Sequence, residues 1–122
     1  MSSALLHSHA DILEARARIF RALGDENRLR IFQLLVESDE PLNVSTICDR
    51  VELPANLVSH HLRCLANCTM VEATQDGRKR FYEVSRPEAV EMVRLADDCI
   101  KQDIENVLGC EIVEKTGETD VG

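Results

Sequence analysis

Apolar residues recur at three- and four-residue steps along most of the chain, with polar residues between them. This spacing places apolar side chains on one face of a helix and predicts a mainly helical protein. The predicted helices span residues 10–23, 26–37, 44–51, a segment from 55 to about 68, and 87–108. Asp25 and Asn43 are good N-caps and Pro87 suits a first helical turn, so side chains mark these boundaries as well.

Two short segments, 70–74 and 81–84, alternate apolar and polar residues and predict strands. The residues 75–78 join them and contain Asp76-Gly77, a pair typical of a tight hairpin. A short helix, a turn, a second helix and a basic hairpin in this order predict a winged helix-turn-helix, mainly α with a β-hairpin wing. The helix that begins at Ala55 is then the one that reads DNA.

The composition indicates one domain, because 122 residues with 44% hydrophobic content can bury a core. We expect a single domain over 1–122, with an N-terminal extension at 1–9 and a mobile tail at 111–122. The start of the chain is too polar for a secretory signal, and no apolar run is long enough to span a membrane, so we expect a cytoplasmic protein without a membrane partner. The first and last helices predict a homodimer interface, and on the last helix the apolar face is Val93, Ala96, Ile100, Ile104 and Val107.

The net charge of −8 is uneven along the chain. Residues 53–82 carry four basic and two acidic side chains, whereas residues 83–122 carry four basic and eleven acidic ones. A local basic surface can therefore bind DNA although the whole chain is acidic, because salt screens charges beyond about 8 Å. The expected base-edge contacts are Asn56, Ser59 and His60, and the expected phosphate contacts are Arg63, Arg78, Lys79 and Arg80.

Cys64 and Cys68 lie four residues apart on the predicted DNA-reading helix. Residues at this spacing share a helix face with Cβ atoms roughly 6 Å apart, so two thiolates can bind one soft metal ion. The five cysteines (48, 64, 68, 99 and 110) are an odd number in a domain large enough to fold without disulfides, and we expect them to be reduced. His61 precedes Cys64 by about one turn and is a further ligand candidate, although capping or a DNA contact is favoured for it.

Other interpretations of these residues stay open at this level. Cysteine is among the most buried residue types, so Cys64 and Cys68 can be core residues, and packing is favoured for Cys48 and Cys99. If the inducer is an oxidant, the same cysteines would form a redox switch. A winged helix that binds only proteins would explain the net negative charge of the chain. An enzyme is not expected, because the chain contains no recognisable nucleophile–base–acid set, phosphate loop or open metal site.

Three segments carry a resemblance to a known family: Phe20–Ile31, Val58–Leu65 and Asp76–Tyr82. Over roughly residues 10–105 the chain resembles the ArsR/SmtB transcriptional repressors. The resemblance implies a homodimer that binds operator DNA with inverted half-sites and leaves it when an inducer binds, often a metal or metalloid ion. Pro54 departs from the pattern, because it stands where the family usually has a helix-starting serine, which implies a different operator contact there.

The resemblance also distinguishes among metal sites. The Cys-x-Cys pair of arsenite and some cadmium sensors would fall on Asn43 and Ser45, so that site is absent. In zinc and nickel sensors of the family, the metal ligands lie on the last helix. The corresponding positions of this chain hold Arg86, Glu88, Cys99 and Gln102, which are a poor match for those metals. The cysteines of the cadmium- and lead-sensing CmtR branch, with a tail ligand from the opposite subunit, fall on Cys64, Cys68 and Cys110. We therefore expect cadmium or lead as the inducer, with arsenic(III) or zinc as alternatives, and no organic cofactor.

Overall fold

The computed structural model describes residues 6–111, which form six helices and three strands. In chain order these are α1 (His9–Leu23), α2 (Glu26–Glu37), β1 (Leu42–Asn43), α3 (Val44–Val51), α4 (Ala55–Asn67), β2 (Val71–Asp76), β3 (Lys79–Val84), α5 (Pro87–Ile100) and α6 (Ile104–Leu108). The order confirms a mainly helical winged helix-turn-helix.

Polar side chains fix the starts of the central helices. The Asp25 carboxylate accepts a hydrogen bond from the Arg28 amide at 2.9 Å and begins α2. The Asn43 side chain accepts one from the Thr46 amide at 2.8 Å and begins α3. These bonds satisfy amides that have no partner inside a helix, and they confirm both predicted N-caps.

The core lies where α2, α3 and α4 meet the sheet. Its largest fully buried side chains are Ile31, Phe32, Ile47, Val58, Leu62, Leu65 and Met70. Five of the seven come from α2 and α4, so the packing of these two helices sets the position of α4.

The wing is longer than the sequence pattern predicted. β2 continues to Asp76 and β3 starts at Lys79, which leaves Gly77 and Arg78 as the turn. Gly77 has a φ of +66°, a conformation that glycine adopts without steric cost. The antiparallel sheet has the order β1-β3-β2, and the two-residue β1, which the sequence did not predict, pairs Leu42 with Tyr82.

The prediction of one helix over 87–108 was wrong, because the helix breaks after Ile100 and restarts at Ile104. At the break Asp103 has φ −145° and ψ 38°, and its amide donates to the Ile100 carbonyl at 3.2 Å. Its carboxylate accepts a hydrogen bond from the Asn106 side chain at 2.9 Å. Short polar side chains such as aspartate offer local hydrogen bonds that compete with a continuous helix.

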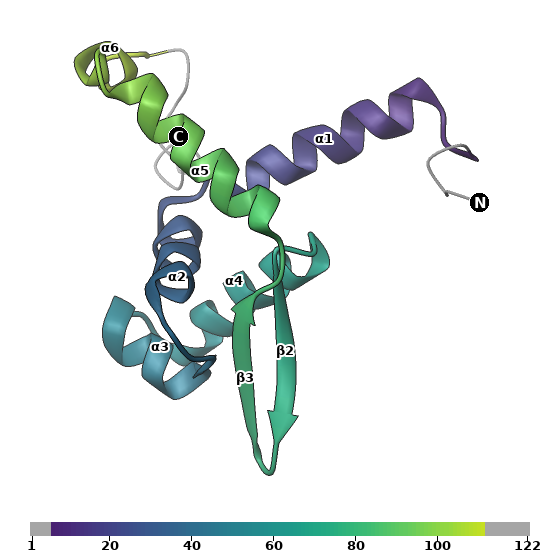
Figure 1. Ribbon diagram of the computed structural model, residues 1–122, viewed down its shortest axis with the longest axis vertical. Coiled ribbons are helices and arrows are strands. Elements are labelled where there is room, and N and C mark those ends of the chain that lie inside the picture. Colours follow the sequence, from purple (N-terminus) through teal and green to yellow (C-terminus); the bar gives the residue numbers. More distant parts are fainter. Residues whose placement is uncertain (1–5, 112–122) are drawn as a thin grey trace.

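The helices at the two ends of the described chain leave the body on the side away from the wing tip (Figure 1). α1 and α5 diverge from each other there, and each carries apolar side chains in contact with solvent. The exposed apolar residues on α1, α5 and α6 are Leu13, Phe20, Leu95, Ile104, Val107 and Leu108. Within residues 6–111 no helix combines the length and the hydropathy needed to cross a membrane.

Candidate nucleic-acid interface and thiol site

One face of α4 is buried and the opposite face is open to solvent. The buried face contains Val58, His61, Leu62 and Leu65. Three of the four residues expected to contact DNA on this helix are exposed, namely Asn56, His60 and Arg63, and Ser59 is half-buried beside them. The structure therefore places these four side chains on one accessible stripe, as helical spacing requires.

The N-terminus of α4 has no side-chain cap. Pro54 occupies the N-cap position without a capping hydrogen bond, and the first turn has no acidic residue. The Leu57 and Val58 amides both donate to the Pro54 carbonyl, at 3.1 and 3.0 Å. The earlier amides of this turn remain available for an anion such as a DNA phosphate.

The wing carries its basic residues in the open. Arg78 lies in the turn, Lys79 and Arg80 begin β3, and all three are exposed. Because neighbouring residues of a strand point to opposite faces, Lys79 and Arg80 present their charges on the two sides of the hairpin.

His61 does not take the DNA-facing or capping role that was favoured for it. Only 5% of its surface is exposed, and its Nε2 lies 3.9 Å from the Asp25 Oδ1 atom. The Nδ1 atom is buried without a hydrogen-bond partner. Burial lowers the pKa of His61, Asp25 opposes that change, and the positive charge of Arg28 adds to it. His61 is therefore a buried residue of the contact between α4 and α2.

Cys64 and Cys68 meet at the C-terminal end of α4. Both are half-buried against the core, Cys68 is the C-cap, and the two thiols are close enough to share a hydrogen bond. Partial burial raises the pKa of the Cys68 thiol and Cys64 adds to the increase, whereas the charges of Arg28 and Arg18 oppose it. Two adjacent thiols can lose their protons to a soft cation that binds them as thiolates.

Cys110 is not part of this thiol pair within one chain. It is exposed, just after α6, and residues 6–111 contain no group of three His, Cys, Asp or Glu side chains placed to hold a metal ion. Cys48 packs against the core, in agreement with the role favoured for it, whereas Cys99 is exposed on α5. Among residues 6–111, a single chain therefore supplies two adjacent thiols without a third potential ligand grouped with them.

Two residues to which the sequence did not point affect this pair: the charge of Arg28 opposes the rise in the Cys68 pKa, and Thr69 follows Cys68 in the chain. The Arg28 guanidinium donates to the carbonyls of Arg21 and Ala22, both at 3.3 Å, and so connects the end of α1 to α2. Thr69 directly follows Cys68 and adopts a positive φ of 63°. Glycine or asparagine usually occupies the left-handed position that follows a helix C-cap. The sequence has neither residue directly after Cys68, and this absence was the available signal that Thr69 adopts an unusual backbone conformation.

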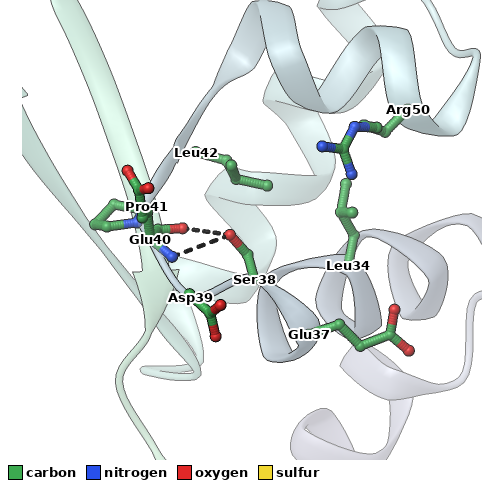
Figure 2. A pocket seen from close by; sticks show the side chains of 8 residues that line it. All are labelled: Leu34, Glu37, Ser38, Asp39, Glu40, Pro41, Leu42 and Arg50. Carbon is green, nitrogen blue, oxygen red and sulfur yellow. Dashed lines mark hydrogen bonds between the residues drawn. The ribbon is translucent and has the colours of Figure 1, made fainter.

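A pocket of about 470 Å³ lies between the end of α2, the loop after it and α3. Figure 2 shows the Ser38 hydroxyl hydrogen-bonded to the backbone of Glu40, with Arg50 on the other side. None of the residues expected to bind DNA or metal lines it. The pocket is therefore separate from both the accessible stripe of α4 and the thiol pair.

Comparison with known proteins places this geometry in a family. A family model described as a helix-turn-helix domain matches residues 23–66, from the end of α1 through most of α4. The chain is similar to the probable mercury resistance operon repressor of Streptomyces lividans, with 35% identity over 80% of this chain and 75% of the relative. It is also similar to CmtR, an HTH-type transcriptional regulator of Mycobacterium bovis, with 33% identity over 84% of this chain and 92% of the relative.

A solved structure agrees at the level of the fold. The homodimeric winged helix-turn-helix DNA-binding domain of a possible ArsR-family regulator from Mycobacterium bovis matches with a TM-score of 0.70 and 24% identity, over 82% of this chain and 93% of that one. Together with the two relatives above 30% identity, the motifs on α2, α4 and the wing identify the chain as a member of the ArsR/SmtB family of winged helix-turn-helix transcriptional regulators.

Proposed function

We propose that this protein is a cytoplasmic, homodimeric repressor that leaves its operator when a soft metal ion binds Cys64 and Cys68 with Cys110 of the other subunit. The observation that carries the proposal is the position of Cys64 and Cys68, one turn apart and half-buried at the C-terminal end of α4, the helix that presents Asn56 and His60 to DNA. A ligand at this position acts directly on the helix that reads the operator.

The donor set fits a soft cation. Thiolates prefer cadmium, lead, mercury or arsenic(III) to hard ions, and three sulfurs without a fourth ligand do not favour a closed zinc site. When bound, the metal would supply a covalent-like connection between thiolates of two chains. The name of the Streptomyces relative concerns mercury, so mercury joins cadmium and lead among the ions to be compared.

The second subunit has two roles in this proposal. It covers the exposed apolar residues of α1, α5 and α6, among which Leu13 is 63% and Phe20 is 61% exposed. It also brings a second Cys110 to the thiol pair, since Cys110 is not beside the pair of its own chain. Two α4 helices in a symmetric dimer then face successive major grooves of an operator with inverted half-sites.

An anaerobic titration of the fully reduced protein with cadmium tests the metal site. We expect thiolate-to-cadmium charge-transfer absorbance that saturates at one ion per subunit, and a reduced signal in Cys64→Ser, Cys68→Ser and Cys110→Ser. Cys48→Ser and Cys99→Ser serve as matched controls and keep the wild-type titration. Equal binding in all five variants would refute the site.

A second assay connects the site to DNA. Fluorescence anisotropy with operator DNA, obtained by in vitro selection on the metal-free protein, is expected to show release on addition of cadmium. The Cys64→Ser and Cys68→Ser variants are expected to bind the same DNA and to stay bound at the same cadmium concentration. Release of these variants at the wild-type concentration would contradict the proposal.

The proximity of Cys64 and Cys68 also favours an alternative function, a thiol redox switch. A peroxide would accept two electrons and two protons from Cys64 and Cys68, leaving a disulfide and two water molecules. The raised pKa of Cys68 works against it, because the thiolate is the reactive form. Release by hydrogen peroxide without metal, reversed by dithiothreitol, would favour this alternative over the metal site.

A further inference from the structure

The C-terminal end of α4 is closed by a specific backbone turn. The Thr69 amide donates to the Ala66 carbonyl at 3.0 Å, and the Met70 amide donates to the Leu65 carbonyl at 2.9 Å. With Cys68 as C-cap, these two bonds form a Schellman motif. In this motif the residue after the cap has a left-handed backbone, and glycine usually occupies it.

Thr69 holds that left-handed conformation without being glycine. Its φ is +63°, and a β-branched residue at positive φ is a genuine outlier. Such strain persists only where neighbouring groups hold the residue in place. Here the Ser85 hydroxyl donates to the Thr69 carbonyl at 2.8 Å, and the Arg86 Nε donates to the Thr69 hydroxyl at 3.3 Å.

Thr69, Ser85 and Arg86 form a connection, which we name the Thr69 joint, between two functional elements. At one end Thr69 follows Cys68, the C-cap of α4 and a proposed metal ligand. At the other end Arg86 is the N-cap of α5, the helix that contributes Leu95 to the proposed dimer surface. The connection from the DNA-reading helix to the dimer helix therefore includes one strained residue that two side-chain hydrogen bonds hold in place.

We infer that the Thr69 joint is the two-state element through which metal occupancy of the thiol pair changes the orientation of α4 relative to α5. The inference rests on the proposed function. A ligand that draws the Cys68 thiol toward the other subunit acts on the C-cap, and Thr69 is the next residue. Because the left-handed conformation of Thr69 is already strained, we expect Thr69 to change conformation more easily than its neighbours. The closed joint then belongs to the DNA-bound state and the open joint to the metal-bound state, and the metal shifts the balance between them.

Two substitutions that leave both thiols in place should shift this balance in opposite directions. Thr69→Gly relieves the strain of the closed joint, so release from DNA is expected to need roughly tenfold more cadmium, a factor that corresponds to about 1.4 kcal/mol. Ser85→Ala removes one bond of the closed joint, so release is expected at a lower cadmium concentration. The DNA affinity of both metal-free variants is expected to stay close to wild type, because the closed joint dominates without metal.

The experiment measures three quantities for each protein. They are the cadmium dissociation constant from charge-transfer absorbance, the DNA dissociation constant without metal, and the cadmium concentration at half-release from operator DNA. Arg94→Gln, an exposed α5 variant that loses an ion pair with Glu91 outside the joint, is the matched control and is expected to behave as wild type. Cooperative thermal unfolding confirms that each variant is folded.

The outcomes separate the two claims. Opposite shifts in Thr69→Gly and Ser85→Ala, with an unchanged control, support the joint as the coupling element. Wild-type half-release in both variants overturns the inference and leaves the proposed function standing. A wild-type protein that binds cadmium and is not released, or does not bind it, removes the proposed function and the inference with it.

Discussion

The imidazole of His61 shows how burial sets the behaviour of one side chain of α4. It lies in the contact with α2, with Asp25 at 3.9 Å and its Nδ1 atom unpartnered. Desolvation opposes the charged form, and this outweighs the attraction of Asp25, so the pKa of His61 falls below its usual value of 6.5. The folded state thus keeps a neutral imidazole that the unfolded chain protonates more readily.

This difference predicts a pH-dependent stability. The unfolded chain binds a proton on His61 near pH 6.5, where the folded chain does not, so the contribution of His61 is fully present above that pH and declines below it. The free energy of unfolding in urea is expected to decrease between pH 7.5 and 5.5, by at most about 1.4 kcal/mol per pH unit from this residue. In His61→Gln the decrease should be smaller, whereas the exposed His60→Gln control should follow wild type. An identical pH dependence in wild type and His61→Gln would contradict the assignment.

The backbone of Thr69 gives a second prediction for one residue. Glycine adopts a positive φ without steric cost, so Thr69→Gly is expected to raise the free energy of unfolding by about 1 kcal/mol even though it removes the hydroxyl bonded to Arg86. Thr74→Gly on β2 is the control and should lower stability by about 0.5–1 kcal/mol, because an extended residue gains nothing from glycine. Chemical denaturation of both variants checks the pair, and a destabilised Thr69→Gly protein would show that Thr69 is not strained.

At the scale of elements, the wing carries three consecutive exposed basic residues, Arg78, Lys79 and Arg80. Each of Arg78, Lys79 and Arg80 that neutralises a phosphate releases counterions, which makes DNA affinity fall with salt. Replacing one of them by alanine is expected to reduce the slope of log affinity against log salt by about 1, whatever the DNA sequence. Lys101→Ala is the control, because the exposed Lys101 lies at the C-cap of α5 and pairs with Asp98, and this variant should leave the slope unchanged. An unaltered slope in all three wing variants would exclude phosphate contact by the wing.

The elements could be predicted from the sequence where side chains mark their limits. α2 and α3 begin after Asp25 and Asn43, and both N-caps form the predicted hydrogen bonds. The break between α5 and α6 was missed, because Asp103 interrupts an apolar pattern that continues through Ile104 and Val107. The two-residue β1 was missed as well, because it exists only through its pairing with β3 and has no periodicity of its own.

The candidate site was predictable to a similar extent. Spacing alone placed Cys64 and Cys68 on one face of a helix, and in the structure both lie half-buried, one turn apart, at the end of α4. It could not show that His61 faces the core, since Ser59, His60 and His61 are all polar and only packing distinguishes them. The Thr69 joint depends on residues 16 and 17 positions apart, Ser85 and Arg86, and no local pattern connects them.

At the scale of the whole molecule, most of the exposed large apolar side chains among the described residues lie on α1, α5 and α6. Phe20 is 61% and Leu108 is 75% exposed, and both lie on the helices that leave the body in Figure 1. Burial of such side chains against a second copy removes apolar area from water, at about 25 cal/mol per Å². These helices are therefore the surface at which the proposed dimer forms.

Phe20→Glu is expected to convert the dimer into a monomer, because it places a charge in the apolar contact. Light scattering coupled to size-exclusion chromatography measures the mass of the variant, and operator affinity should fall with it. Val36→Glu is the matched control, since Val36 is an exposed apolar residue on α2. A dimeric Phe20→Glu protein would place the interface elsewhere.

In the proposed dimer, Cys110 completes the thiol site of the other subunit, so two chains with different cysteine substitutions are expected to form one intact site together. In a mixed dimer of Cys68→Ser and Cys110→Ser chains, one of the two metal sites contains both substitutions. The other site contains only wild-type cysteines. Neither variant alone should give the full charge-transfer signal, yet unfolding and refolding them together should restore part of it. Genetic complementation of this kind would make metal sensing a property of the pair of chains, and it would not occur if each chain held its own complete site.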